Sequence, residues 1–326
     1  MRAVVCREFG TAKDLQISEI GTPDPQPGEV LMDNHVAALN FPDTLAIAGK
    51  YQIRAEPPFV PGGEAAGTVV AVGDGVTDYK PGDRVISVGS TGAFAEQQCV
   101  PAAQLTLMPD NMDFATGAGF LVTYGTSLYA LRQCGHLQAA ETLVVLGAAG
   151  GVGLAAVDLG KAAGAKVIAA ASSEDKLDVA MAAGADLRIN YSAASLRDEI
   201  KELTDGIGAD VIYDPVGGEY SEAAFRAMAW NGRFLVVGFA AGDIPAMPLN
   251  LPLLKNCSIK GVFYGAWAQR EPALARENVA ELFRLYATGK LHPLISQRFE
   301  LADFKEAFAM LTERRAIGKL VLTIAH

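Results

Sequence analysis

The chain has 326 residues, half of them hydrophobic and 20% charged, and carries a formal net charge of −10 at pH 7. The length is sufficient for two domains with separate cores, and the acidic balance argues against nucleic acid and anionic membranes as partners. No apolar run reaches the roughly 18 residues that span a bilayer. Residues 1–6 lead directly into strand-like sequence without a signal-peptide core, and none of the four cysteines forms a Cys-x-x-Cys pair. We therefore expect a reducing, cytoplasmic location without disulfides.

The first 120 residues predict short strands separated by turns. Strands are expected at residues 29–39, 67–72, 83–88 and 93–100, with Pro- and Gly-rich turns between them. This pattern predicts a barrel-like, mostly antiparallel β domain.

Residues 143–153 read Leu-Val-Val-Leu-Gly-Ala-Ala-Gly-Gly-Val-Gly. An apolar strand enters a glycine turn, a helix starts near Val152, and a second strand follows at residues 166–171. A glycine motif alone is weak evidence, but this context is typical of a dinucleotide-binding βαβ unit. The glycines let the backbone approach a pyrophosphate, and the helix directs its positive end at that charge.

Strands and helices alternate from about residue 122 to residue 265. Further strands are expected at residues 187–190, 210–214, 233–239 and 258–263, and helices at residues 195–203 and 219–230. This alternation predicts an α/β fold with a doubly wound parallel sheet of the Rossmann type. Two amphipathic helices, at residues 272–288 and 302–315, and a strand at residues 320–324 are expected to follow.

The end of the second strand of this unit favours NADPH over NADH. A dehydrogenase that prefers NAD places Asp or Glu there, about 20 residues after the glycine loop, to bind the ribose 2′-hydroxyl. Here Ser172 and Ser173 occupy that place, Lys176 follows one helical turn later, and Tyr191 ends the third strand. Hydroxyl groups and a positive charge suit a 2′-phosphate. Alternatively, the serines only cap a helix and Lys176 is a solvated surface charge.

Several motifs occur together in order along the chain. They are residues 60–67 (Val-Pro-Gly-Gly-Glu-Ala-Ala-Gly), 80–85 (Lys-Pro-Gly-Asp-Arg-Val), 123–126 (Thr-Tyr-Gly-Thr), 229–240 and the terminal Gly318-Lys319. With the glycine loop they make the chain resemble medium-chain dehydrogenases/reductases, and among these the zinc-free quinone oxidoreductase branch. The resemblance implies a GroES-like catalytic domain of residues 1–122 and 266–326 and a Rossmann NADP-binding domain of residues 123–265. It also implies a homodimer formed through the edge of the cofactor-domain sheet.

Zinc-dependent members of the superfamily use a cysteine and a histidine whose positions correspond to Asn40 and Gly63. Asn is a poor zinc ligand and Gly has no side chain, and the four histidines show no ligand spacing. We therefore expect no catalytic or structural zinc.

The resemblance also implies where the cofactor and the acceptor bind. Cofactor contacts are expected, besides Ser172, Ser173, Lys176 and Tyr191, from Asn40, Thr123, Thr126, Ala149, Gly150, Gly151, Val152, Phe239, Phe263, Tyr264 and Lys319. Asn40 and Asp43 are expected near the nicotinamide as catalytic residues, although Asn40 could simply cap a turn and Asp43 could be scaffold. Tyr51 and Tyr124 are our candidates for the donor to a developing oxyanion, with packing as the alternative for both.

A site without a Lewis acid stabilises an alkoxide poorly, which disfavours alcohol oxidation. Hydride addition to a quinone or another α,β-unsaturated carbonyl spreads charge onto an oxygen that hydrogen-bond donors can stabilise. An NADPH-dependent reductase of such acceptors is therefore the leading hypothesis. A short-chain enoyl-CoA reductase and an NADPH-binding sensor or structural protein with little turnover are the alternatives.

Overall fold

The computed structural model describes residues 1–324, which divide into two compact units. Unit 1 comprises Met1–Val122 and the chain from Leu294 onward, and unit 2 comprises Thr123–Pro293. The sequence assigned residues 266–293 to the first domain, whereas the structure groups them with unit 2. The physical reason is packing within unit 2, where Trp267 stacks on Tyr129 with ring centroids 4.3 Å apart.

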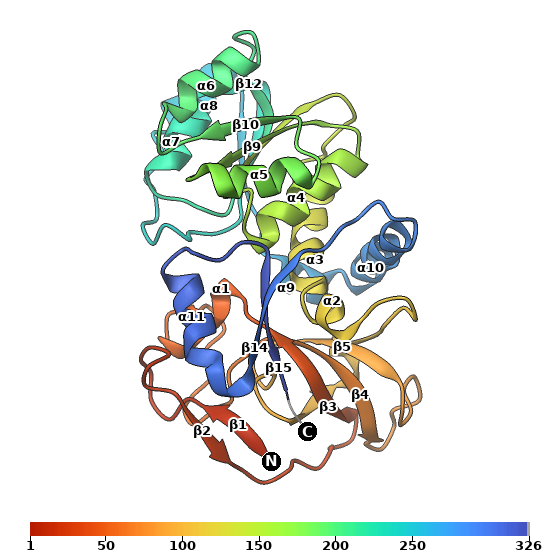
Figure 1. The fold of residues 1–326 in the computed structure, drawn as a ribbon. Helices are drawn as coiled ribbons and strands as arrows, with labels where there is room; N and C mark the ends of the chain where they lie inside the picture. The colour runs from red at the N-terminus through yellow and green to blue at the C-terminus, as the bar shows by residue number, and fades with distance from the viewer. Residues whose placement is uncertain (325–326) are drawn as a thin grey trace. The chain divides into compact units, whose positions relative to one another are not determined.

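Unit 1 is built on a mixed sheet and a short hairpin (Figure 1). In the described chain the sheet order is β14-β15-β3-β4-β5-β7, with β6 paired to β3; β14 and β15 run parallel and the other pairs antiparallel. The strands are β3 (Glu29–Ala38), β4 (Glu64–Val72), β5 (Arg84–Val88), β6 (Gln97–Pro101), β7 (Leu105–Leu107), β14 (Ile295–Glu300) and β15 (Lys319–Thr323), and the hairpin is β1 (Arg2–Val5) with β2 (Gln16–Glu19). The predicted antiparallel character is confirmed, and the strands β2, β7 and β14 were not foreseen.

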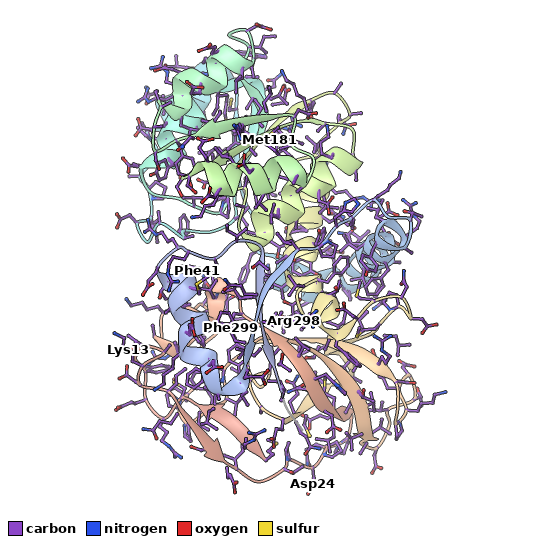
Figure 2. All side chains as sticks on the ribbon, in the orientation of Figure 1. Lys13, Asp24, Phe41, Met181, Arg298 and Phe299 are labelled. Atoms are coloured by element: carbon purple, nitrogen blue, oxygen red, sulfur yellow. The ribbon has the colours of Figure 1, made fainter. Side chains whose placement is uncertain are left out.

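The core of unit 1 lies between this sheet and its helices. Phe94 and Phe308 meet edge to face at 5.9 Å, and Phe299 of β14, labelled in Figure 2, packs against the same cluster. The helices are α1 (Phe41–Ile47), α2 (Phe114–Ala118) and α11 (Phe304–Thr312), with short 3₁₀ turns at Ala102–Gln104 (η1) and Leu301–Asp303 (η3). The predicted helix at residues 302–315 is shorter because Arg314 adopts a left-handed conformation with φ 58°.

Unit 2 contains a parallel sheet with the strand order β10-β9-β8-β11-β12-β13. This is the doubly wound order of the Rossmann fold, and the chain reverses its direction of winding between β8 and β11. The strands are β8 (Thr142–Leu146), β9 (Lys166–Ala171), β10 (Leu187–Asn190), β11 (Ala209–Asp214), β12 (Met228–Val236) and β13 (Ser258–Gly261).

Both faces of this sheet are covered by helices, which explains why its central strands are apolar throughout. Val144 and Leu146 belong to one buried cluster with residues of α6 and α7, whereas Leu143 faces Gly160 of α4. The helices are α3 (Leu121–Tyr129), α4 (Gly151–Ala162), α5 (Glu174–Ala182), α6 (Leu196–Leu203), α7 (Glu219–Arg226), α8 (Asn250–Lys255), α9 (Tyr264–Arg270) and α10 (Pro272–Ala287), and a π-helical turn at Ala130–Cys134 (η2) continues α3.

Two stretches of unit 2 differ from the prediction. The helix expected at residues 219–230 ends at Arg226, because β12 begins at Met228 and passes through Asn231 with φ 62°. The segment after Phe263, for which the sequence predicted no helix, forms α9. None of the helices within residues 1–324 combines the length and the apolar character that a bilayer crossing requires.

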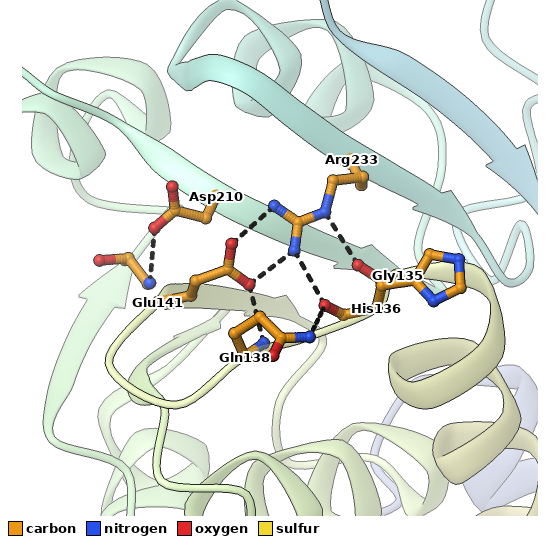
Figure 3. A network of polar contacts seen from close by, with 7 residues as sticks. Gly135, His136, Gln138, Glu141, Asp210 and Arg233 are labelled. Carbon is orange, nitrogen blue, oxygen red and sulfur yellow. Dashed lines mark hydrogen bonds and ion pairs between the residues drawn. The ribbon is translucent and has the colours of Figure 1, made fainter.

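A polar network fixes the amino end of β8 (Figure 3). Arg233 of β12 donates two hydrogen bonds to the carboxylate of Glu141, at 2.9 and 2.6 Å, and a third to the carbonyl of Gly135 at 2.8 Å. Asp210 accepts the backbone N–H of Thr142 at 2.8 Å. These contacts align the start of β8, whose other end carries the glycine loop.

Candidate active site

The glycine loop joins β8 to α4 at the point where the strand order reverses. Gly147 has φ 58°, a conformation that favours glycine, and a Cβ on Gly153 would lie 2.2 Å from the carbonyl oxygen of Gly147. Gly150 is the N-cap of α4 and has no side chain to satisfy the first-turn N–H groups. These free donors and the helix dipole fit a pyrophosphate. The predicted cofactor contacts Ala149, Gly150, Gly151 and Val152 lie in this loop and in the first turn of α4.

The ends of β9 and β10 bring the predicted 2′-phosphate residues to one edge of the sheet. The strands pair in parallel with Asn190 beside Ala171, so Ser172 and Tyr191 each follow the carboxyl end of a neighbouring strand. The half-buried Lys176 donates from Nζ to Ser172 Oγ at 3.3 Å. Ser173 is the N-cap of α5, as expected, but its hydroxyl makes no capping bond there. The edge thus offers hydroxyl groups and an ammonium, a donor set that fits a phosphate dianion.

Helix α3 carries the next predicted residues. Thr123 is buried and Thr126 is half-buried one turn later. Ser127 donates to the carbonyl of Val152 at 2.9 Å, which fixes α3 against the first turn of α4. A Cβ on Gly125 would lie 2.6 Å from the hydroxyl of Tyr264, so glycine is what permits α9 to approach α3 at this point.

The hydroxyl of Tyr124 is engaged inside unit 2. It donates to Asp158 Oδ2 at 2.8 Å, and the same carboxylate oxygen accepts the backbone N–H of His292 at 2.6 Å. Burial, together with the charge and the hydrogen bond of Asp158, raises the pKa of Tyr124 far above its usual value. Asp158 is an acid on an apolar helix face that sequence reasoning missed.

Phe239 and Phe263 lie after β12 and β13, respectively. Phe239 is half-buried, and a Cβ on Gly217 would lie 2.9 Å from its ring. Phe263 is 46% exposed and is the N-cap residue of α9. Both residues therefore follow the carboxyl ends of strands of the parallel sheet, as the glycine loop does.

Unit 1 holds a buried cluster of opposite charges around Lys319. Its ammonium donates to the carbonyl of Leu39 at 2.8 Å and to Asn40 Oδ1 at 2.7 Å, and lies 3.6 Å from Glu64 Oε2. Glu64, fully buried, also accepts the Asn40 amide at 3.2 Å and the backbone N–H of Val122 at 2.8 Å. Lys319 and Glu64 thereby fix both ends of the Asn40 amide. Sequence reasoning did not include Glu64 in the site.

Asp43 extends this cluster. Its Oδ2 accepts the backbone N–H of Asn40 at 2.7 Å, one half of a capping box at the start of α1. Burial raises the pKa of Asp43 to about 7; the N–H groups of Asn40 and Gly63 and the charge of Lys319 oppose this increase, and the charge of Glu64 adds to it. Burial also raises the pKa of Glu64 and lowers that of Lys319. Two buried carboxyl groups therefore feel the charge of one ammonium, and Glu64 forms the ion pair with it.

Tyr51 lies half-buried beyond the end of α1. Its pKa is raised by burial and by the charge of Asp43. At neutral pH it is a phenol with a proton to donate.

Comparisons with known proteins identify the family of this chain. Residues 26–110 match the alcohol dehydrogenase GroES-like domain family, and residues 151–281 match the zinc-binding dehydrogenase family. The quinone oxidoreductase-like protein 2 homolog of Nematostella vectensis is 41% identical over 325 residues, which cover 98% of this chain and 88% of that protein. A quinone oxidoreductase of Pseudomonas aeruginosa is 36% identical, with 96% and 97% covered. The chain belongs to the quinone oxidoreductase branch of the medium-chain dehydrogenases/reductases.

A solved structure of this branch supports the assignment. The crystal structure of Escherichia coli quinone oxidoreductase complexed with NADPH superimposes with a TM-score of 0.93 at 29% identity, covering 99% of this chain and 100% of that one. The predicted family and fold class are thus confirmed, and the chain is an oxidoreductase of this family.

The family description of residues 151–281 mentions zinc, but the ligand positions inferred for zinc members are chemically unsuitable here. Asn40 already binds the ammonium of Lys319, and a Cβ on Gly63 would lie 3.0 Å from the carbonyl oxygen of Gly89. In residues 1–324 no group of three or more His, Cys, Asp and Glu side chains is arranged to hold a metal ion.

Proposed function

We propose that the protein transfers hydride from NADPH to quinones or other α,β-unsaturated carbonyls without a metal ion. One observation carries this proposal: the amide at the inferred cysteine-ligand position, Asn40, is bound by an internal ammonium, that of Lys319. The residue types at both ligand positions suit hydrogen bonding and close packing rather than zinc coordination. A conjugated acceptor needs no Lewis acid, because the charge spreads onto an oxygen that a phenol can protonate.

The cofactor proposal concerns unit 2. NADPH would be held by its pyrophosphate at the glycine loop and by its 2′-phosphate at Ser172, Ser173, Lys176 and Tyr191. The NADPH complex of the Escherichia coli relative supports this choice. When bound, the cofactor supplies the hydride, and the protein orients it and excludes water. Thr123, Thr126, Phe239, Phe263 and Tyr264 are proposed to contact its nicotinamide half.

The acceptor proposal concerns Asn40, Asp43 and Tyr51 of unit 1. Tyr51 is our proton donor, Asp43 is the charged group that raises its pKa, and Asn40 acts as a polar group oriented by Lys319 and Glu64. Lys319 then acts through Asn40, because its ammonium hydrogens face Leu39, Asn40 and Glu64. For Tyr124 we propose a positioning function on α3, since its hydroxyl donates its hydrogen bond to Asp158.

The test is oxidation of NADPH by 1,4-benzoquinone with a metal chelator present, with NADH in parallel. We expect the rate of NADPH oxidation to be the same with and without the chelator and to exceed the rate with NADH. In Tyr51→Phe the rate should fall at least tenfold. Loss of turnover on chelation would contradict the metal-free mechanism. NADPH binding with turnover only of crotonyl-CoA would favour the enoyl-CoA reductase, and binding without turnover of either acceptor would favour a sensor.

We also propose a homodimer formed through β13, the terminal strand of the parallel sheet. All four residues of β13 are exposed, and so are the nearby Leu249, Leu253 and Leu254, at 81%, 78% and 68%. An exposed strand edge beside apolar side chains is a ready pairing surface. Light scattering after size exclusion should give a dimer, and Ile259→Lys, in the middle of β13, should give a monomer.

For location we propose a reducing compartment, the cytoplasm. The four cysteines, Cys6, Cys99, Cys134 and Cys257, are free thiols. Cell fractionation tests this, and recovery of the protein in an oxidising compartment would contradict it.

A further inference from the structure

Two acids, Glu174 and Asp175, begin α5 close to the proposed 2′-phosphate site, and Glu174 is the one that a side chain of the neighbouring strand binds. Glu174 is the first residue of α5, between Ser172 and Lys176 in sequence, and its side chain is 58% exposed. A carboxylate at this end of the sheet repels a phosphate dianion. The position of the Glu174 side chain therefore bears directly on the discrimination between NADPH and NADH.

The structure holds this carboxylate from the neighbouring strand. Asn190, the last residue of β10, donates from Nδ2 to Glu174 Oε1 at 2.8 Å. The other end of the Asn190 amide is fixed as well, since its Oδ1 accepts the backbone N–H of Ser192 at 3.1 Å. Because both ends are used, the amide presents its donor side to Glu174.

Arg188, two residues earlier on β10, adds positive charge on the same side. Its guanidinium lies 3.7 Å from Glu174 Oε2 and donates to Asp178 Oδ1 at 2.6 Å. Alternate residues of a strand point to the same face, so Arg188 and Asn190 act together on Glu174. The carboxylate is thus drawn toward β10, whereas Lys176 is engaged with Ser172.

We propose that Asn190, assisted by Arg188, is a specificity-determining residue for NADPH, because it holds Glu174 on the β10 side and so limits the repulsion of the 2′-phosphate. This inference rests on the proposed binding of that phosphate at Ser172 and Lys176. The groups are exposed to solvent, so screening keeps the effect to a few-fold.

The test measures dissociation constants by calorimetry for NADPH, NADH and 2′,5′-ADP, so that no turnover is needed. We expect Asn190→Ala to raise the dissociation constants of NADPH and 2′,5′-ADP about threefold at low salt and to leave that of NADH unchanged. In the double variant Asn190→Ala/Glu174→Gln the loss should disappear, because the charge that Asn190 restrains has been removed. The matched control is Glu222→Gln, a half-buried acid of the same unit paired with Arg226, which should change none of the three constants.

Two results would overturn the inference. One is an equal loss of NADH affinity in Asn190→Ala, which would indicate a merely structural role. The other is a loss that persists in the Glu174→Gln background. Lys176→Ala separates the inference from the proposal beneath it: if that variant lowers NADPH affinity relative to NADH while Asn190→Ala does not, only the inference fails. If Lys176→Ala leaves the ratio unchanged, the proposed phosphate site fails and the inference with it.

Discussion

The cluster around Lys319 in unit 1 and the network around Glu174 in unit 2 both join acids to cations, but under opposite conditions of burial. Glu64, Asp43 and Lys319 are at most 6% exposed, whereas the side chains of Glu174 and Arg188 are 58% and 46% exposed. A buried charge that loses its partner keeps its full desolvation penalty, whereas water and salt replace the partner of an exposed one. The first cluster should therefore contribute to the free energy of unfolding, whereas the second should affect only the relative affinities for NADPH and NADH.

The largest effect is expected for Lys319→Met, which tests the contribution of the buried cluster to stability. The change leaves Glu64 and Asp43 buried without their cation, and we expect the free energy of unfolding to fall by about 3–5 kcal/mol. Urea denaturation followed by circular dichroism measures it. The control is Lys50→Met, at an exposed lysine of the same unit, which should stay within about 0.5 kcal/mol of the parent. Equal effects of the two variants would contradict the assigned role of burial.

Asp43 should make this stability depend on pH. Its pKa is about 7 in the folded protein, above the value of about 3.9 for an unfolded chain. The raised pKa means that the folded state binds the proton more tightly, so the stabilisation is complete below pH 4 and is lost as the pH rises through 7. Between these limits the free energy of unfolding should fall by up to about 1.4 kcal/mol per pH unit relative to Asp43→Asn. Parallel pH profiles of the parent and the variant would contradict it.

Lys176→Ala tests the exposed side of the comparison. We expect NADPH affinity to fall about tenfold, or about 1.4 kcal/mol, with NADH affinity and the free energy of unfolding unchanged. The loss should diminish at high salt, because the site is open to solvent. A large loss of stability in this variant would place Lys176 with the structural charges instead.

The smallest effect is expected for Asp178→Asn. This variant breaks the 2.6 Å ion pair between Asp178 and Arg188. The side chain of Arg188 is 46% exposed and that of Asp178 is 69% exposed. The free energy of unfolding should change by less than about 1 kcal/mol. A loss comparable to that of Lys319→Met would remove the distinction between the two clusters.

The sequence predicted the elements of the candidate site that depend on local patterns. The glycine loop, β9, β10 and the serines after β9 are carried by runs of neighbouring residues, and the structure has them where they were expected. It also indicated Asn40, Asp43 and Lys319, but only through the resemblance. Their mutual contacts were not foreseen, because Lys319 and Asn40 are 279 residues apart in the chain.

Glu64 and Asp158 were missed for a related reason. Each is an acid in an otherwise apolar element, and such a residue signals a buried partner without revealing which one it is. Lys319, at the start of the apolar strand β15, carried the complementary signal. The sequence placed residues 266–293 in the first domain, whereas they pack within unit 2. The stacking of Trp267 on Tyr129 joins distant parts of the chain and leaves no local pattern in the sequence.

The position of Lys319 also bears on the order in which the protein assembles during synthesis. Unit 2 is one continuous stretch of chain, whereas unit 1 needs β14, α11 and β15 from beyond residue 293. On the ribosome, Asp43 and Glu64 therefore emerge long before the lysine that neutralises them, and unit 2 can complete its sheet in the interval. Unit 1 can therefore complete its sheet only after β15 has been synthesised, and until then its acids remain in contact with water.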